Sequence, residues 1–159
     1  MSQYYVAQIC LNGHVITGSA DEYPMFKKKF CPDCGQPTIM QCKYCKADIQ
    51  GNYDSSGILD FGNYKCPTFC HNCGNPYPWT EEKLNAALEL IAEDDELSNG
   101  DKQILSQSLP DLIINTPKTQ LAAARFKKFV RSATSVTGEG LKQILVEVVS
   151  ETAKKLIWS

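Results

Sequence analysis

Seven cysteines and one histidine form four short pairs in the first half of the chain, and this pattern predicts a metal-binding protein. The pairs are Cys10-x3-His14, Cys31-x2-Cys34, Cys42-x2-Cys45 and Cys70-x2-Cys73. Structural zinc takes four sulfur or imidazole ligands in a tetrahedron, and a two-residue spacing lets one tight turn direct two sulfurs at one ion. Because the four pairs supply eight ligands, we expect two Zn²⁺ ions, each bound by four side chains.

The residues beside these pairs favour the tight turns that such sites need. Gly35 and Gly74 each follow the second cysteine of a pair, and glycine can adopt the positive φ that lets backbone N–H groups approach a thiolate. Asn12-Gly13 is a β-hairpin signal, and it should bring Cys10 and His14 together.

The way in which the four pairs share two ions stays open. Sequential pairing joins the first pair to the second and the third to the fourth, which gives a double zinc ribbon. Interleaved pairing joins the first to the third and the second to the fourth, as in a RING-like cross-brace. We favour sequential pairing, because the turns containing Gly35 and Gly74 then fall at the closing pair of each site.

Cys66 and His71 fall outside the pattern. Cys66 stands three intervening residues before Cys70, so it could replace Cys70 as a ligand, or act as a reactive thiol with His71 as its base. The simplest interpretation is a partly buried cysteine with no metal role. His71 is then a turn residue, because the cysteines already fill four positions.

Structural rather than catalytic chemistry is expected at both ions. A catalytic zinc keeps one position for water and has an acid-base residue nearby, whereas four protein ligands close a site. The sequence contains no His-Glu-x-x-His, no Gly-x-x-x-x-Gly-Lys and no serine-nucleophile motif. We therefore favour a protein that is not an enzyme.

The elements that position the ligands should be short strands and hairpins. Between residues 4 and 78, short apolar runs are broken by Gly, Pro, Asn and Asp, which favours strands over helices. The expected strands lie within YYVAQIC, HVITG, PTIMQC and GILDFGNYKC. We interpret residues 75–79 as an apolar seam, with Trp79 packed against the first helix.

A helical pattern replaces these runs after Trp79. Thr80 is the expected N-cap of a first helix that extends to Ile91. A second helix is expected over 101–109, ended by Pro110, and a third after Pro117 with apolar residues from Ala122 to Ala133 on one face. A fourth is expected over 141–157, after a loop at 138–140. The helices should bury their apolar stripes in a small bundle.

The expected fold class is therefore α+β, with a β-rich double zinc-ribbon module over residues 1–79 and an α-helical bundle over residues 80–159. Structural zinc contributes on the order of 10 kcal/mol or more of apparent folding free energy per site. Two ions can therefore replace the hydrophobic core that the first half is too broken to build.

Composition excludes several other classes. The chain has 159 residues, a formal net charge of -2 and 43% hydrophobic residues, which argues against disorder. The pI near 5.7 is not that of a generic nucleic-acid binder. The apolar runs are too short to span a bilayer, and the first residues lack a secretory signal, so we expect a cytoplasmic protein without membrane contact. Reduced cysteines are then available as metal ligands.

Several segments together resemble a bacterial family that is catalogued only as a domain of unknown function. They are Tyr4-Tyr5, Gln8-Ile9-Cys10, Asn12-Gly13-His14-Val15-Ile16, Lys29-Phe30-Cys31, Cys34-Gly35, Asn75-Pro76-Tyr77-Pro78-Trp79-Thr80, Ser150-Glu151-Thr152 and Lys154-Lys155. The resemblance covers nearly the whole chain and carries no established activity. It implies a zinc-ribbon protein with a helical C-terminal part, and it places the zinc ligands at the eight paired residues named above.

Three functions follow from these patterns. The first is a zinc-binding structural or adaptor protein that presents its loops or a helical face to another protein. The second is nucleic-acid binding through the cations between Arg125 and Arg131, which surround two phenylalanines. The third is a RING-like ligase module, which requires interleaved metal pairs.

Overall fold

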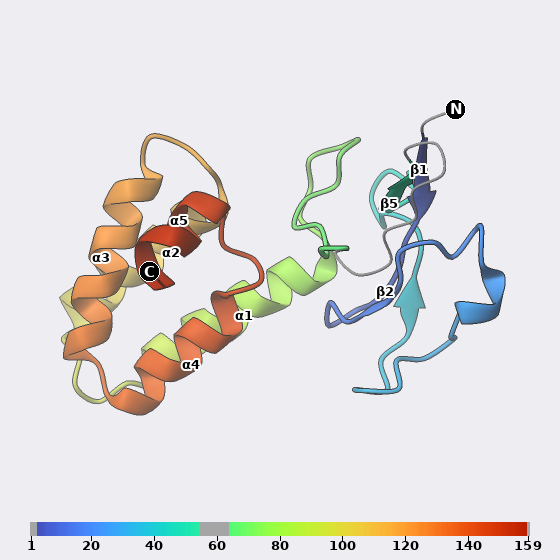
Figure 1. The fold of residues 1–159 in the computed structure, drawn as a ribbon. Coiled ribbons are helices and arrows are strands. Elements are labelled where there is room, and N and C mark those ends of the chain that lie inside the picture. Colours follow the sequence, from blue (N-terminus) through green and yellow to red (C-terminus); the bar gives the residue numbers. More distant parts are fainter. Residues whose placement is uncertain (1–2, 55–63, 159) are drawn as a thin grey trace. The chain divides into compact units, whose positions relative to one another are not determined.

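The chain divides into two compact units, Met1–Glu81 and Glu82–Ser159. The computed structural model describes residues 3–54 and 64–158. The first unit contains short antiparallel strands and the second contains helices, so the expected α+β fold class is confirmed (Figure 1). No helix in the described ranges has both the length and the apolar character that crossing a bilayer requires.

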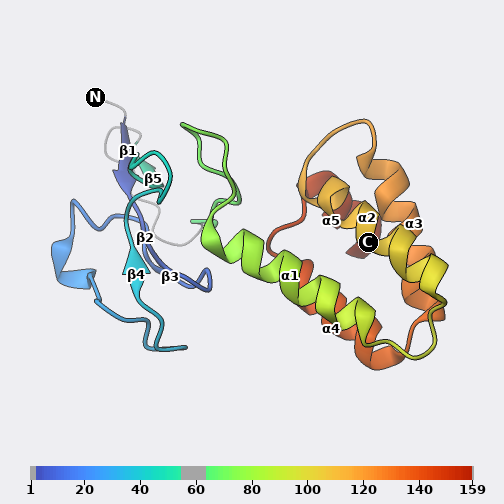
Figure 2. The same cartoon turned by 180° about the vertical axis from the view of Figure 1, so that it is seen from behind.

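The described residues of the first unit form two small antiparallel sheets (Figure 2). One pairs β1 (Gln3–Val6) with β5 (Gln50–Asp54). The other has the order β3-β2-β4, formed by β3 (Val15–Thr17), β2 (Gln8–Cys10) and β4 (Thr38–Ile39). A 3-10 turn, η1, spans Pro24–Phe26.

The strands expected in the first three apolar runs are confirmed, whereas the described residues of the fourth run form no strand. Its residues 57–63 lie outside the described residues, and residues 64–66 are irregular. Strand β5 was not expected, because QGNYD contains polar residues and a glycine that are weak strand signals.

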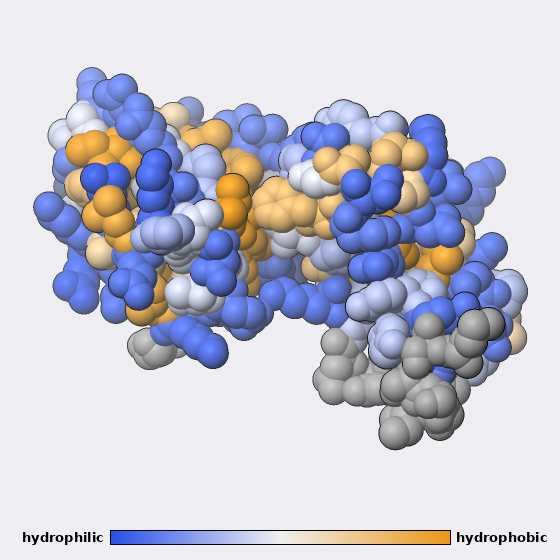
Figure 3. All heavy atoms as spheres, turned by 90° about the horizontal axis from the view of Figure 1, so that it is seen from above, coloured by the Kyte–Doolittle hydropathy of each residue, from blue (hydrophilic) through white to orange (hydrophobic). Residues whose placement is uncertain are grey.

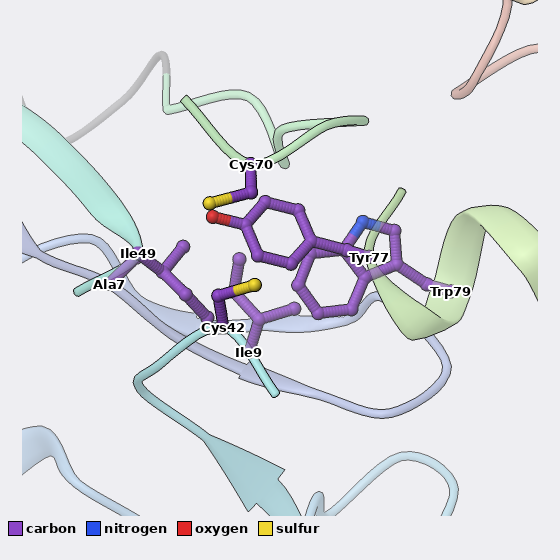
Figure 4. Packing of buried hydrophobic residues seen from close by; sticks show 7 residues of the cluster. All are labelled: Ala7, Ile9, Cys42, Ile49, Cys70, Tyr77 and Trp79. Atoms are coloured by element: carbon purple, nitrogen blue, oxygen red, sulfur yellow. The ribbon is translucent and has the colours of Figure 1, made fainter. Parts of the chain in front are cut away.

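A hydrophobic cluster fills the first unit, and two of the paired cysteines are part of it (Figure 4). Its buried members are Ala7, Ile9, Cys42, Ile49, Cys70, Tyr77 and Trp79. The first half therefore has a small core of its own, and the sulfurs of Cys42 and Cys70 lie in it.

Tyr77 and Trp79 belong to this core, so the prediction that Trp79 packs against the first helix is wrong. Trp79 lies on that helix, α1 (Pro78–Ala92), and its ring stacks on Tyr77 with centroids 4.7 Å apart. The Trp79 Nε1 donates a hydrogen bond of 2.7 Å to the Pro67 carbonyl. The indole therefore buries its ring and satisfies its one donor within the first unit.

Thr80 does not cap α1, because the helix begins two residues earlier at Pro78. Proline suits a first helical turn, where its missing N–H has no partner to lose. Thr80 is fully buried instead, and its hydroxyl donates to the Thr68 carbonyl at 2.8 Å. The first turn of α1 is thus tied to the segment that precedes Cys70.

The second unit holds four further helices: α2 (Asn99–Ile113), α3 (Thr119–Ser132), α4 (Ser135–Leu145) and α5 (Glu151–Trp158). The apolar face expected for the third helix is confirmed in α3, where Ala122, Phe126 and Phe129 are buried. Helix α3 packs on both α2 and α5.

Pro110 does not end the second helix, which continues to Ile113. Burial of Leu112 and Ile113 explains this difference, because the apolar area they remove from water offsets the hydrogen bond that proline cannot make.

The expected fourth helix is two helices, and the expected loop at 138–140 lies inside the first of them. Thr134 caps α4 by accepting from the Thr137 N–H at 3.2 Å, so the helix starts before Gly138. A Cβ at Gly140 would lie 2.6 Å from Leu90 Cδ2, so the glycine permits close packing of α4 on α1. Helix α4 ends at Leu145. Helix α5 begins after Ser150, whose hydroxyl accepts a hydrogen bond from the Ala153 N–H.

A buried carboxylate holds two distant parts of the helical unit together. Asp94 Oδ1 accepts from the N–H groups of Glu96 and Leu97 at 2.9 and 2.8 Å. Its Oδ2 lies 3.0 Å from the N–H of Thr134 and 3.1 Å from the Thr134 hydroxyl. Asp94 thereby joins the end of α1 to the cap of α4.

Hydrogen bonds to the Asp94 carboxylate also determine its ionisation. Burial acts to raise its pKa, but hydrogen bonds from Thr137, Thr134, Leu97 and Glu96 outweigh burial and hold the pKa well below its usual range. The carboxylate is therefore charged in the folded protein at neutral pH.

Candidate metal sites

The first Cys/His group consists of Cys10, His14, Cys31 and Cys34, whose ligand atoms all lie within 4.8 Å of one another. Cys10 and His14 stand at the end of the β2–β3 hairpin, where Gly13 has a φ of 91°, so the hairpin expected from Asn12-Gly13 is confirmed. The Cys10 Sγ lies 3.4 Å from His14 Nδ1 and 3.7 Å from Cys34 Sγ. Cys31 Sγ lies 3.6 Å from the same nitrogen.

The second group consists of Cys42, Cys45, Cys70 and Cys73 and has the same spread of ligand atoms. Cys42 Sγ lies 3.7 Å from Cys73 Sγ, and Cys45 Sγ lies 3.7 Å from Cys70 Sγ. The structure therefore groups the pairs sequentially, first with second and third with fourth. An interleaved arrangement does not match this geometry.

Three of the four pairs lie in turns with the same backbone hydrogen bonds. In each turn the first cysteine's carbonyl accepts from the N–H of the residue four positions later, which is Gly35, Lys46 or Gly74. These three residues have φ values of 75°, 65° and 77°. The positive φ expected at the two glycines is confirmed, and Lys46 adopts it with a side chain.

Substitutions at these matched positions should separate the free-energy cost of a positive φ from the contribution of side-chain contacts. A Cβ at Gly74 meets nothing within 4 Å, so Gly74→Ala should cost about 1 kcal/mol through its positive φ alone. Lys46→Gly removes the strain of a positive φ, which stabilises the folded state, but glycine also raises the conformational entropy of the unfolded chain. Because the two effects oppose each other, the free energy of unfolding of this variant should stay within about 0.5 kcal/mol of the parent. Denaturant unfolding of the metal-loaded chain measures both, and equal losses in the two variants would contradict the argument.

Hydrogen bonds to sulfur favour the ionised cysteines that metals bind. A backbone hydrogen bond from Gln36 is the main cause that lowers the pKa of the Cys34 thiol to about 6. Burial opposes ionisation of Cys70, but backbone hydrogen bonds from Cys73 and Asn72 outweigh it and bring the Cys70 pKa to about 6. Burial raises the pKa of the Cys10 and Cys42 thiols.

Tyr77 contacts the second group directly, which the sequence alone did not predict. Its side chain is 1% exposed, and its hydroxyl forms a hydrogen bond with the Cys70 sulfur. Figure 4 shows the phenol oxygen beside that sulfur. Burial and the neighbouring Cys70 raise the Tyr77 pKa, so the phenol stays protonated and its O–H donates a hydrogen bond to the sulfur.

Removal of this donor should weaken metal binding at the second group. We expect Tyr77→Phe to lower the affinity of that site about tenfold, since outer hydrogen bonds to ligands have effects of this size. Tyr64→Phe is the matched control, because the Tyr64 hydroxyl donates to the Gln50 carbonyl at 2.6 Å rather than to a sulfur. Competition with a chromophoric chelator measures both affinities, and equal values for the two variants would exclude a role for the hydroxyl in metal binding.

Cys66 and His71 lie outside both groups. Cys66 is partly buried and packs against the hydrophobic cluster, which agrees with the interpretation as a packing residue. His71 is an exposed residue of the turn between Cys70 and Cys73.

The fold and the two groups define an α+β protein with two candidate metal sites of cysteine and histidine in its first unit. A family model described as "Uncharacterized protein conserved in bacteria (DUF2321)" matches residues 3–157, and the chain belongs to that family. This confirms the resemblance noted from the sequence. No curated protein and no solved structure matches the chain.

Proposed function

We propose that the protein is a non-enzymatic, zinc-binding interaction protein whose first unit is a double zinc ribbon. The distances between ligand atoms carry the zinc assignment. Two sulfurs bound to one tetrahedral zinc lie about 3.8 Å apart, and a sulfur and a nitrogen about 3.6 Å apart. Sulfur atoms lie 3.7 Å apart in each group, and the two S···N distances in the first group are 3.4 and 3.6 Å. Disulfides would require about 2.05 Å.

A structural role for the ions fits the number of their ligands. Each group supplies four side-chain ligands, which fill a tetrahedral zinc and leave no position for a substrate or an activated water. Thiolate-rich sets favour zinc over magnesium or calcium, which prefer oxygen ligands.

Exposed aromatic residues of the first unit support a protein partner. Tyr4, Phe26, Phe30, Tyr44 and Tyr53 are each about half exposed, and Met25 is 72% exposed. Aromatic residues and methionine are enriched in protein interfaces. Hydrophobic residues in both units reach the surface among hydrophilic ones (Figure 3).

Tyr4 and Tyr53 are a contacting pair among these exposed residues. They lie opposite each other in the β1–β5 pair, with ring centroids 4.9 Å apart. Neither ring is needed for the buried cluster, so both are available to a partner.

The proposal is tested by purifying the untagged protein from its bacterial source and measuring metal and partners together. We expect two zinc ions per chain by native mass spectrometry, and one partner protein that is recovered by the parent but not by a Tyr4→Ser, Tyr53→Ser variant. Leu121→Ser, at an exposed position of α3, is the control that should keep the partner. Absence of zinc, or a partner retained by the double variant, would contradict the proposal.

The two other functions have less support. A RING-like module needs interleaved pairs, and the groups in the structure are sequential. A nucleic-acid face needs the cations between Arg125 and Arg131 to form one charged surface. Lys128 Nζ instead lies over the ring of Phe129, and Lys127 and Arg131 line a cavity that does not include Lys128.

A further inference from the structure

A small cavity of about 130 Å³ lies within the helical unit, apart from both metal groups. Its lining residues are Phe126, Lys127, Val130 and Arg131 of α3, Lys142 of α4 and Ile157 of α5. Half of this lining is cationic, half is apolar, and no carboxylate is present.

The three cations have no ion-pair partner among the described residues. Lys83 of the same unit, by contrast, pairs with Glu147 at 2.8 Å. Lys127 and Arg131 are four positions apart on one helix, where like charges destabilise the helix. Lys142 is half-buried, whereas Lys127 and Arg131 are exposed. Helix stability alone therefore does not explain why these three charges converge.

An anion between the three side chains would relieve their repulsion. A guanidinium offers a planar pair of donors that matches a phosphate, and each lysine adds a compact positive charge. The apolar side chains on the same lining suit the carbon atoms attached to a phosphate ester. The volume is below the roughly 300 to 1,000 Å³ of pockets that enclose whole ligands, so the cavity fits one group of a larger molecule.

We propose that this cavity binds the phosphate group of a phosphomonoester through Lys127, Arg131 and Lys142. The ester is either a soluble metabolite or the headgroup of a lipid, since both present the same group. Val130 and Ile157 of the same lining contact the carbon that carries the phosphate, and the fully buried Phe126 lies behind them.

The test is a titration of the metal-loaded, full-length chain, followed by amide NMR at constant ionic strength. Glycerol phosphate is the soluble probe, inorganic phosphate tests the group alone, and chloride is the reference salt. We expect saturable shifts confined to α3, α4 and α5, and binding about tenfold weaker in Arg131→Gln and in Lys142→Gln. Arg125→Gln and Lys128→Gln are charge-matched controls on α3 that should bind as the parent does.

Thermal unfolding of each variant shows whether it is folded, so weakened binding in a folded variant can be assigned to the cavity. Equal losses in the site and control variants, or shifts that never saturate, would overturn the proposal. Polynucleotide binding that depends on all five cations, without saturable phosphomonoester binding, would overturn it in favour of a nucleic-acid face.

A second arm separates the two sources of the ester. Vesicles of phosphatidylcholine with added phosphatidic acid should bind the parent and not Arg131→Gln if a lipid headgroup is the ligand. Saturable glycerol phosphate binding without binding to these vesicles identifies a soluble ester. Binding to neither glycerol phosphate nor the vesicles would overturn the proposal.

Discussion

Removal of metal is expected to unfold the first unit of the 159-residue chain and to leave the helices of the second unit folded. Structural zinc contributes on the order of 10 kcal/mol or more per site, which exceeds what the small cluster around Ile9 and Ile49 can replace. The second unit buries its own apolar residues from α1 to α5, including Leu105, Phe126 and Leu141. We therefore expect its stability not to depend on either metal group.

Hydrogen exchange followed by mass spectrometry resolves the two units in one sample. After chelation, amides of β1 to β5 and of the three cysteine turns should exchange rapidly, while those of α2 to α5 stay protected. Re-addition of zinc should restore protection. Continued protection of the strands without metal would show that the hydrophobic cluster is sufficient by itself.

Two cysteines in the same cluster provide a matched pair of variants for this result. Cys70 belongs to the second metal group, whereas Cys66 packs nearby and lies outside both groups. Cys70→Ser should lose one zinc ion and the protection of the first unit. Cys66→Ser changes the same atom type and should keep both ions, so a loss of metal in this variant would revise the ligand set.

Asp94→Asn is expected to destabilise the helical unit by about 2 kcal/mol. The asparagine keeps one oxygen for the N–H groups of Glu96 and Leu97. Its amide nitrogen cannot accept from the Thr134 N–H, which then lacks the partner that joined it to the end of α1. Asp95→Asn is the control, because that neighbouring side chain is exposed.

The stabilisation by Asp94 should also depend on pH. Its folded pKa is depressed, so the carboxylate stabilises the unit fully above the unfolded pKa of about 3.9 and loses this effect as the pH falls toward the folded value. The stability of the parent, measured by denaturant unfolding with helical circular dichroism, should therefore decrease below about pH 4. Asp94→Asn should lack this part of the acid dependence; an unchanged acid dependence would contradict the assignment.

The sequence was most informative where the physical signal is local. Cysteine spacing and the glycines after Cys34 and Cys73 placed the turns, because a turn is determined by a few adjacent residues. The apolar period of α3 was equally clear, since one helix face is buried along its whole length.

Features that depend on tertiary contacts could not be predicted in the same way. Pro110 remains inside α2 because residues after it are buried, and Gly140 remains inside α4 because Leu90 packs against it. The Asp94 contact with Thr134 spans 40 positions. The sequence contains only a weak indication of the hydrogen bond from Tyr77 to Cys70. An aromatic residue shortly after a cysteine turn does not by itself predict a contact with the cysteine.

The placement of Cys42 and Cys70 within the apolar cluster has a consequence for the protein in the cell. Because the same sulfurs would hold the ion and fill the interior, ion uptake and collapse of the first unit form one linked equilibrium. A ligand that binds only the native state raises its population with the free ligand concentration. The share of chains with an ordered first unit should therefore follow the supply of the metal ion, and starvation for that ion would lower this share.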